Sequence, residues 1–276
     1  MTAITKDESA QMPIEFKLNG KAAAAAPGET IIQAAQRHGI EIPHLCYKEG
    51  MRPDGNCRAC MVEIKGERVL APSCCRVPTP GMEVTTDSAR AVHSQKMVLE
   101  LLLSDMPQER HTLHSELDHW AARLDVGKPR FRSRHNPPAD LSHYAMAVNL
   151  DSCIQCTRCV RACREEQVND VIGYAFRGEH SKIVFDLDDP MGESTCVACG
   201  ECVQACPTGA LMPAREVGLV KPDKQVNSVC PYCGVGCQLT YNIKDNKILY
   251  VDGRDGPSNH ERLCVKGRYG FDYVHH

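Results

Sequence analysis

Two hydrophobic periodicities follow each other near the N-terminus. Ile14 to Leu18 alternates apolar and polar side chains, which predicts a strand. Asn19-Gly20 is a hairpin turn, from which Lys21 to Ala26 can return as a second strand. Pro27 to Thr30 breaks that strand and can cap a helix, and Ile31 to His38 has helical spacing. The pattern therefore predicts a hairpin followed by a short helix.

Weaker strand patterns and then two helical patterns come next. Met61 to Ile64 and Val69-Leu70 supply strand material around a turn at Lys65-Gly66. Ala91 to Leu103 and His111 to Leu124 repeat apolar side chains at helical spacing. We therefore expect further strands of a small sheet and then two helices.

Short hairpins dominate the rest of the chain. Residues 127–138 are basic and contain proline, which is typical of a linker, and residues 216–227 have the composition of a second connector. Tyr174 to Arg177 and Lys182 to Phe185 can pair as one hairpin, and Gln238 to Asp252 can form another. Strands and helices are thus mixed along the chain, as in an α+β protein.

Composition adds an unusual amount of sulfur. The 276 residues include seventeen cysteines, and the formal net charge is only −3. Residues 1–11 are charged and lack the apolar core of a signal peptide, and no run approaches the roughly 18 apolar residues of a membrane span. We therefore expect a cytoplasmic protein, in which clustered cysteines indicate metal or redox chemistry. The charge favours neither nucleic acid nor a membrane surface as a partner.

The first cysteine group is Cys46, Cys57, Cys60 and Cys74, with Cys75 left over as a spare thiol. Three ligands on one loop and a fourth from a distant segment is the plant-type arrangement for a [2Fe–2S] cluster, although the first gap is longer here. With the preceding hairpin and helix, this is the order of a β-grasp ferredoxin. Zinc is the alternative, because the Cys57-x2-Cys60 pair alone would also suit it. Cys75 in place of Cys74 is the alternative fourth ligand.

The second and third groups repeat one spacing, Cys-x2-Cys-x2-Cys-x3-Cys, which is the run of two-cluster bacterial ferredoxins. In that arrangement the fourth cysteine of each run binds the other cluster. The crossing locks both halves into one pseudo-symmetric domain with two [4Fe–4S] clusters, or cubanes. We expect cubane A on Cys153, Cys156, Cys159 and Cys206, and cubane B on Cys163, Cys196, Cys199 and Cys202.

The fourth group is Cys230, Cys233, Cys237 and Cys264. Its spacing favours a third cubane, which we call cubane C, over the alternative of zinc. The chain would then hold one [2Fe–2S] and three [4Fe–4S] clusters. Such a protein carries electrons, and we expect none of its side chains to act as a catalytic acid or base.

Two of these motifs resemble known families. Gly55 to Glu63, in residues 13–92, looks like the N-terminal [2Fe–2S] domain shared by the large iron–sulfur subunit of respiratory complex I, iron-only hydrogenases and NAD-dependent formate dehydrogenases. Val229 to Cys237 looks like the start of a molybdopterin oxidoreductase, particularly a formate dehydrogenase α subunit. The order of the modules is most similar to the α subunit of soluble, NAD-dependent molybdenum formate dehydrogenase.

The resemblance implies a modular α+β fold in five parts. It consists of a disordered tail over residues 1–12, a β-grasp [2Fe–2S] domain over 13–92, a helical linker over 93–142, a two-cluster bacterial-ferredoxin domain over 143–224, and the small [4Fe–4S] domain of molybdopterin oxidoreductases over 225–276.

The linker departs from the complex I pattern, which carries one histidine and three cysteines for a further cubane. The matching positions hold Met106, Arg110, Leu113 and His119, so that cluster should be absent. His111, His114 and His119 could suggest a metal, but their spacing is better explained by solvated helix positions.

The other departure is the end of the chain at His276. Relatives continue into a region that binds molybdenum bis-pterin guanine dinucleotide, so we expect that cofactor and formate oxidation to CO₂ only in a missing C-terminal region or a partner. By resemblance, Lys266 would lie between cubane C and the pterin; the alternative is a solvated surface lysine. The other expected partner is a flavin- and NAD-binding subunit with its own iron–sulfur clusters.

Three functions therefore compete. The favoured one is the electron-transfer arm of an NAD-dependent formate dehydrogenase, which makes the chain part of an enzyme without holding its catalytic site. The second is an iron–sulfur subunit of another NAD-linked oxidoreductase, such as a hydrogenase or a complex I-like assembly. The third is a stand-alone ferredoxin-like carrier.

Overall fold

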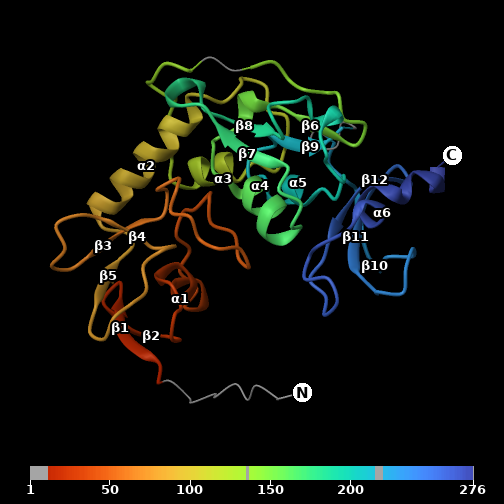
Figure 1. The fold of residues 1–276 in the computed structure, drawn as a ribbon. Helices are drawn as coiled ribbons and strands as arrows, with labels where there is room; N and C mark the ends of the chain where they lie inside the picture. The colour runs from red at the N-terminus through yellow and green to blue at the C-terminus, as the bar shows by residue number, and fades with distance from the viewer. Residues whose placement is uncertain (1–11, 135–136, 215–219, 276) are drawn as a thin grey trace. The chain divides into compact units, whose positions relative to one another are not determined.

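The computed structural model describes residues 12–134, 137–214 and 220–275, and for residue 275 the backbone only. The described residues form two compact units (Figure 1). One unit runs to residue 47 and continues over 53–99, and the other takes 48–52 and everything from residue 100. The tail expected over residues 1–12 lies outside the described residues except for Met12. No helix among the described residues is long and apolar enough to cross a membrane.

The first unit is a mixed five-stranded sheet with the order β2-β1-β5-β3-β4. Strand β1 pairs in parallel with β5, and the other neighbouring strands are antiparallel. Phe16 and Leu18 on alternate positions of β1 are buried, as the apolar alternation predicts. The strands are β1 (Ile14–Leu18), β2 (Lys21–Ala25), β3 (Met61–Ile64), β4 (Ala71–Pro72) and β5 (Glu83–Thr85).

Helix α1 (Ile31–Arg37) packs its apolar side chains into the core of this sheet, close to β2 (Figure 1). At its start the backbone N–H of Thr30 donates to Gln33 Oε1 at 3.0 Å, so the helix is capped where the sequence predicts. Helix α2 (Ala89–Leu103) follows β5 and begins two residues before the predicted position. The buried Gln95 amide donates to the Met61 carbonyl at 2.9 Å, which fixes this helix against β3.

The second unit contains three small sheets and several short helices. Strand β6 pairs with β9, β7 with β8, and β10, β11 and β12 form one antiparallel sheet. Its elements are α3 (Glu116–Arg123), β6 (Met146–Val148), α4 (Arg158–Arg161), β7 (Ile172–Ala175), β8 (Lys182–Phe185), α5 (Glu201–Ala205), β9 (Leu211–Pro213), β10 (Lys224–Val229), β11 (Gln238–Lys244), β12 (Lys247–Gly253) and α6 (Val265–Tyr269).

Other predicted boundaries were also wrong. Strand β4 forms at Ala71–Pro72 and not at Val69-Leu70. The helix predicted from His111 begins at Glu116, because the Ser115 hydroxyl accepts the Asp118 N–H at 3.2 Å and caps it there. Strand β7 forms two residues earlier than predicted. The predicted connector over 216–227 contains the start of β10, an edge strand whose side chains are mostly exposed.

Candidate iron–sulfur centres

The first cysteine group converges in the first unit. Cys46, Cys60 and Cys74 are buried, and Cys57 is half-buried. The N–H of Cys46 donates to Cys57 Sγ and the N–H of Cys57 to Cys46 Sγ, both at 3.4 Å. The Cys46 thiol also bonds to that of Cys74, which in turn bonds to that of Cys60. The four predicted ligands therefore share one sulfur-lined site.

The backbone of the Cys57 loop is shaped to direct N–H groups at sulfur. Gly55 and Arg58 both have positive φ, 61° and 60°, and Arg58 is a non-glycine residue in that region. Hydrogen bonds with the thiols of Cys57 and Cys74 lower the pKa of Cys46 most, and the N–H groups of Cys57 and Asn56, which point to Cys46 Sγ, lower it further. Such donors favour a thiolate, which is the form that binds iron.

Cys75 differs from its neighbour Cys74. Cys74 is buried among the other thiols, whereas Cys75 is exposed. Its Sγ lies 3.5 Å from Cys74 Sγ, and 2.9 Å from the place that a Cβ at Gly55 would occupy. The geometry therefore favours Cys74 as the fourth ligand and gives Cys75 a place beside the loop.

This geometry predicts different results for two serine substitutions. Cys74→Ser should abolish the visible absorption and circular dichroism of the [2Fe–2S] cluster and remove about two irons per chain, because the cluster loses a ligand. Cys75→Ser should keep both. Anaerobic reconstitution followed by iron analysis and spectroscopy measures this, and the reverse pattern would make Cys75 the ligand.

The second and third groups repeat one loop conformation. In the first run Gln155 and Thr157 have positive φ, 56° and 61°. In the second run Ala198 and Gly200 stand at the same distances from the first cysteine and also have positive φ, 55° and 75°. Three of these four are non-glycine residues in a region that side chains seldom adopt. The repeat directs N–H groups at sulfur, as in the bond from Ala198 N to Cys196 Sγ at 3.4 Å.

The thiols of the two runs are interleaved. The Cys206 thiol belongs to the other run, but it lies close enough to Cys153 and Cys156 to raise their pKa values. Likewise the Cys163 thiol contributes to the raised pKa values of Cys196, Cys199 and Cys202. The fourth cysteine of each run thus lies near the first three of the other run. The Cys202 thiol also contributes to the raised pKa of Cys159, so the two sets are adjacent.

Burial shapes the chemistry of these thiols. Burial raises the pKa of Cys153 to about 11 and that of Cys156 to about 12, and it raises the pKa values of Cys159 and Cys202 well above their ordinary value. Without metal these groups are neutral thiols at pH 7. Bound iron would reverse this, because a coordinating thiol is deprotonated outright. The sites therefore suit a positively charged inorganic core.

The fourth group lies at one end of the β10–β12 sheet. Cys230 is buried, Cys237 is half-buried, and Cys233 and Cys264 are exposed. Burial and the nearby thiols of Cys230, Cys233 and Cys264 raise the pKa of Cys237, which places all four together. Lys266, in α6 just after Cys264, is exposed. The exposed side of this group can meet another protein surface.

The linker segment is held by polar contacts. Arg110 binds both carboxylate oxygens of Asp118, with distances of 3.0 to 3.2 Å. His111 Nε2 lies 3.0 Å from Asp151, and His119 packs edge-on against Trp120. The described residues contain no group of three or more His, Cys, Asp or Glu side chains placed to hold a single metal ion.

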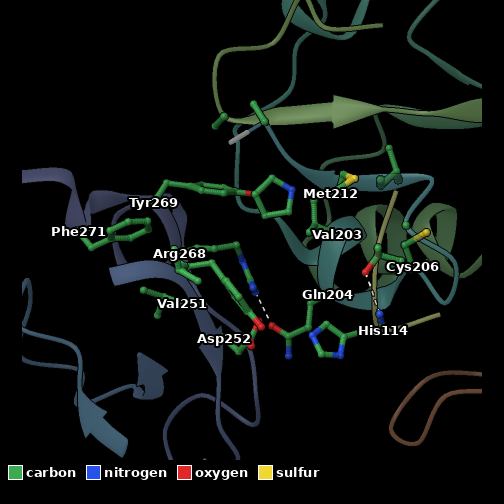
Figure 2. A pocket seen from close by; sticks show the side chains of 18 of the residues that line it. His114, Val203, Gln204, Cys206, Met212, Val251, Asp252, Arg268, Tyr269 and Phe271 are labelled. Atoms are coloured by element: carbon green, nitrogen blue, oxygen red, sulfur yellow. Dashed lines mark hydrogen bonds between the residues drawn. The ribbon is translucent and has the colours of Figure 1, made fainter. Parts of the chain in front are cut away.

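A cavity of about 440 Å³ lies between the two-run region and the C-terminal sheet, and Figure 2 shows its lining. Arg268 and Tyr269 extend into it from α6, and Cys206, a predicted cluster ligand, lines it from the other side. Arg268 is buried and contacts the loop of the third cysteine group. Sequence reasoning missed this arginine, because only its contacts set it apart from the chain's other basic residues.

Three family models match the chain. Residues 11–89 match the 2Fe-2S iron-sulfur cluster binding domain, residues 152–210 the 4Fe-4S dicluster domain, and residues 223–276 the Molybdopterin oxidoreductase Fe4S4 domain. The predicted modular α+β fold is thereby confirmed, and the chain carries domains for both types of cluster. The predicted domain boundaries, ligand sets and numbers of clusters stay predictions.

Three known proteins are similar over most of the chain. A subunit of an NADH-quinone oxidoreductase from Rhizobium meliloti is 33% identical over 95% of the chain. A "Putative formate dehydrogenase" of Staphylococcus haemolyticus is 27% identical over 93%. The crystal structure of an NAD+-reducing [NiFe]-hydrogenase superposes with a TM-score of 0.70 at 26% identity, covering 76% of this chain and 90% of that one. The chain spans 31% of the length of each of the first two relatives.

Proposed function

We propose that this chain is the electron-transfer arm of an NAD-dependent molybdenum formate dehydrogenase. It is a modular iron–sulfur electron-transfer protein, and it resembles a subunit of NADH-quinone oxidoreductase and proteins named as formate dehydrogenases. One observation carries the proposal. The [2Fe–2S] domain, the dicluster domain and the molybdopterin-oxidoreductase domain follow one another in a single chain. This order suits a path from a molybdenum centre toward a flavin and NAD.

The four cysteine sets would hold one [2Fe–2S] and three [4Fe–4S] clusters, which supply one-electron carriers when bound. Cubane C is the candidate entry point, because Cys233 and Cys264 are exposed. Lys266 would stand on its pterin side. The remaining thiols are mostly buried, which excludes water from the path inside the chain. The protein's task is to space the clusters and to tune their potentials by burial and hydrogen bonds to sulfur.

Helix α6 supports transfer between cubanes C and B. It begins directly after the ligand Cys264, and the Arg268 N–H donates to the Cys264 carbonyl at 3.1 Å. The Arg268 Nε then donates to the carbonyl of Cys199, a ligand of cubane B, also at 3.1 Å. The two ligand sets are thus connected by one short helix and two hydrogen bonds. Cubane A follows, because Cys202 and Cys159 are adjacent.

The partner proteins provide the test of the whole assembly. We would tag the full-length gene product that contains this chain, purify it anaerobically from its own host, and analyse metals and flavin. Molybdenum, flavin and formate-dependent NAD⁺ reduction are expected. Nickel instead would favour the hydrogenase alternative, and quinone-linked NADH oxidation the complex I-like one. A preparation with iron but no partner or further metal would favour a free carrier.

Metal content tests the clusters separately. The anaerobically reconstituted chain should contain about 14 irons with matching sulfide, because one [2Fe–2S] and three [4Fe–4S] clusters require that number. Iron and sulfide assays with Mössbauer spectroscopy measure the content and the cluster types. Chelation should also loosen the fold, since cluster binding is coupled to folding. A preparation loaded with zinc, or one with far fewer irons under these conditions, would contradict the assignment.

A further inference from the structure

Helix α6 is anchored by a buried arginine. Arg268 is 3% exposed, and its Nη2 donates to Glu201 Oε1 at 3.1 Å and to Gln204 Oε1 at 2.6 Å. Its Nε donates to the Cys199 carbonyl. Figure 2 shows the guanidinium bonded to Gln204 across the cavity. A buried charge with three partners has little freedom, so the residues beside it on α6 have a fixed position.

Tyr269, the next residue, is held against the loop of cubane B. A Cβ at Gly200 would lie 2.6 Å from the Tyr269 hydroxyl oxygen and 2.2 Å from Arg268 Cδ. Gly200 lies between the ligands Cys199 and Cys202, so the hydroxyl is packed directly on the ligand loop. The ring also packs against the apolar core of this region.

The Tyr269 hydroxyl is buried and has no hydrogen-bond partner among the described residues. A buried hydroxyl left without a partner destabilises the folded state, and such groups are rare in folded proteins. A tyrosine hydroxyl keeps its proton at pH 7, because its ordinary pKa is about 10. The group is therefore a donor beside the loop that carries Cys196, Cys199 and Cys202, the predicted ligands of cubane B.

We propose that the Tyr269 hydroxyl donates a hydrogen bond to a sulfur of cubane B, either a cysteine Sγ or a bridging sulfide. The proposal rests on the assignment of a cubane to this site. It accounts for a buried donor that the protein alone leaves without an acceptor. It also makes α6 a shared element, because Cys264 at its start binds cubane C and Tyr269 at its end tunes cubane B.

The bond should raise the reduction potential of cubane B. Reduction adds negative charge to the cluster, and a donor to sulfur stabilises the more negative form. Tyr269→Phe removes the donor and keeps the ring. We expect one cubane of this variant to become harder to reduce by roughly tenfold in its equilibrium constant, which is 59 mV for a one-electron couple. The potentials of the other clusters should not move.

Potentiometric titration of the reconstituted chain, followed by EPR spectroscopy, measures this shift. Tyr250→Phe is the matched control, because Tyr250 lies half-buried in the same cavity and no thiol is among the groups that shift its pKa. The iron content and the EPR signal of each variant are recorded first. If the wild-type chain holds no cubane here, the cluster assignment fails and the proposal fails with it. If the cubane is present and Tyr269→Phe leaves every potential unchanged, only the hydrogen bond is refuted.

A second variant covers the case in which Tyr269→Phe loses the cubane. Site-specific 3,5-difluorotyrosine at position 269 keeps the shape of the side chain and makes the hydroxyl a stronger donor. The potential of cubane B should then rise, opposite to the effect of phenylalanine. No shift, or a shift in the same direction as phenylalanine, would overturn the proposal.

Discussion

Replacing Cys206 by serine is expected to remove cubane A, although Cys206 belongs to the second cysteine run. Its thiol lies near those of Cys153 and Cys156 of the first run, so the substitution deprives their cluster of a ligand. About four irons per chain should be lost, or about one if the site keeps a three-iron remnant. The EPR signal of cubane B should persist, because its own four ligands are intact.

The reciprocal change, Cys163→Ser, is the matched control. The Cys163 thiol lies near those of Cys196, Cys199 and Cys202, so cubane B should be lost and cubane A retained. The Tyr269→Phe variant identifies the two signals, since it should shift only cubane B. Anaerobic iron analysis and EPR of both serine variants measure the outcome. If each variant instead loses the cluster of its own run, the crossed arrangement is wrong.

The grouping of the cysteines in space was the most predictable part of this protein, because the chemistry of cluster binding fixes their spacing along the chain. A cubane needs sulfurs from a short loop, and Cys-x2-Cys-x2-Cys is a compact segment that supplies three of them. Hairpins with strong turn signals were also predictable, as at β1–β2, where the predicted ends differ from the structure by one residue. In such segments local preference and tertiary packing agree.

Elements that depend on tertiary contacts were not predictable. Strand β10 has mostly exposed side chains, and its pairing with β11 decides its structure. Residues 111–115 have helical spacing, but the contact between His111 and Asp151 and the cap at Ser115 end the pattern there. A single sequence also treats Arg268 as any basic residue, because its role depends on a glycine far away in the chain.

That glycine gives the second large effect. Gly200→Ala should strongly destabilise the protein around cubane B, for two reasons. Its φ of +75° costs an alanine about 1–2 kcal/mol. Its Cβ would also meet Arg268 Cδ at 2.2 Å and the Tyr269 oxygen at 2.6 Å. Displacing Arg268 leaves the buried Glu201 carboxylate without its cation, and breaking such a pair costs about 3–5 kcal/mol.

Gly178→Ala separates the two causes. Gly178 also has a positive φ, 61°, but nothing lies within 4 Å of its Cβ position. It should show the backbone cost alone. The measurement is the rate of loss of cluster absorbance at a fixed urea concentration without oxygen, because loss of a cluster is irreversible and reports kinetic stability. The cluster absorbance of Gly200→Ala should be lost far faster than that of Gly178→Ala. Equal rates would show that Arg268 and Tyr269 move aside at no cost in stability.

Combining Gly200→Ala with Arg268→Ala then tests whether the two residues act through each other. Once the arginine is shortened, the new methyl group no longer displaces it, so the glycine substitution should cost less than in the wild-type background. The costs of the positive φ and of the contact with the Tyr269 oxygen remain. Residues in contact commonly differ from additivity by about 0.5–3 kcal/mol. Simple additivity would mean that Gly200 is needed for its backbone conformation and not for the space that Arg268 of α6 occupies beside it. A large deviation would identify Gly200 as the position that lets the helix bearing Cys264 approach the loop bearing Cys199, and so lets two clusters share one support.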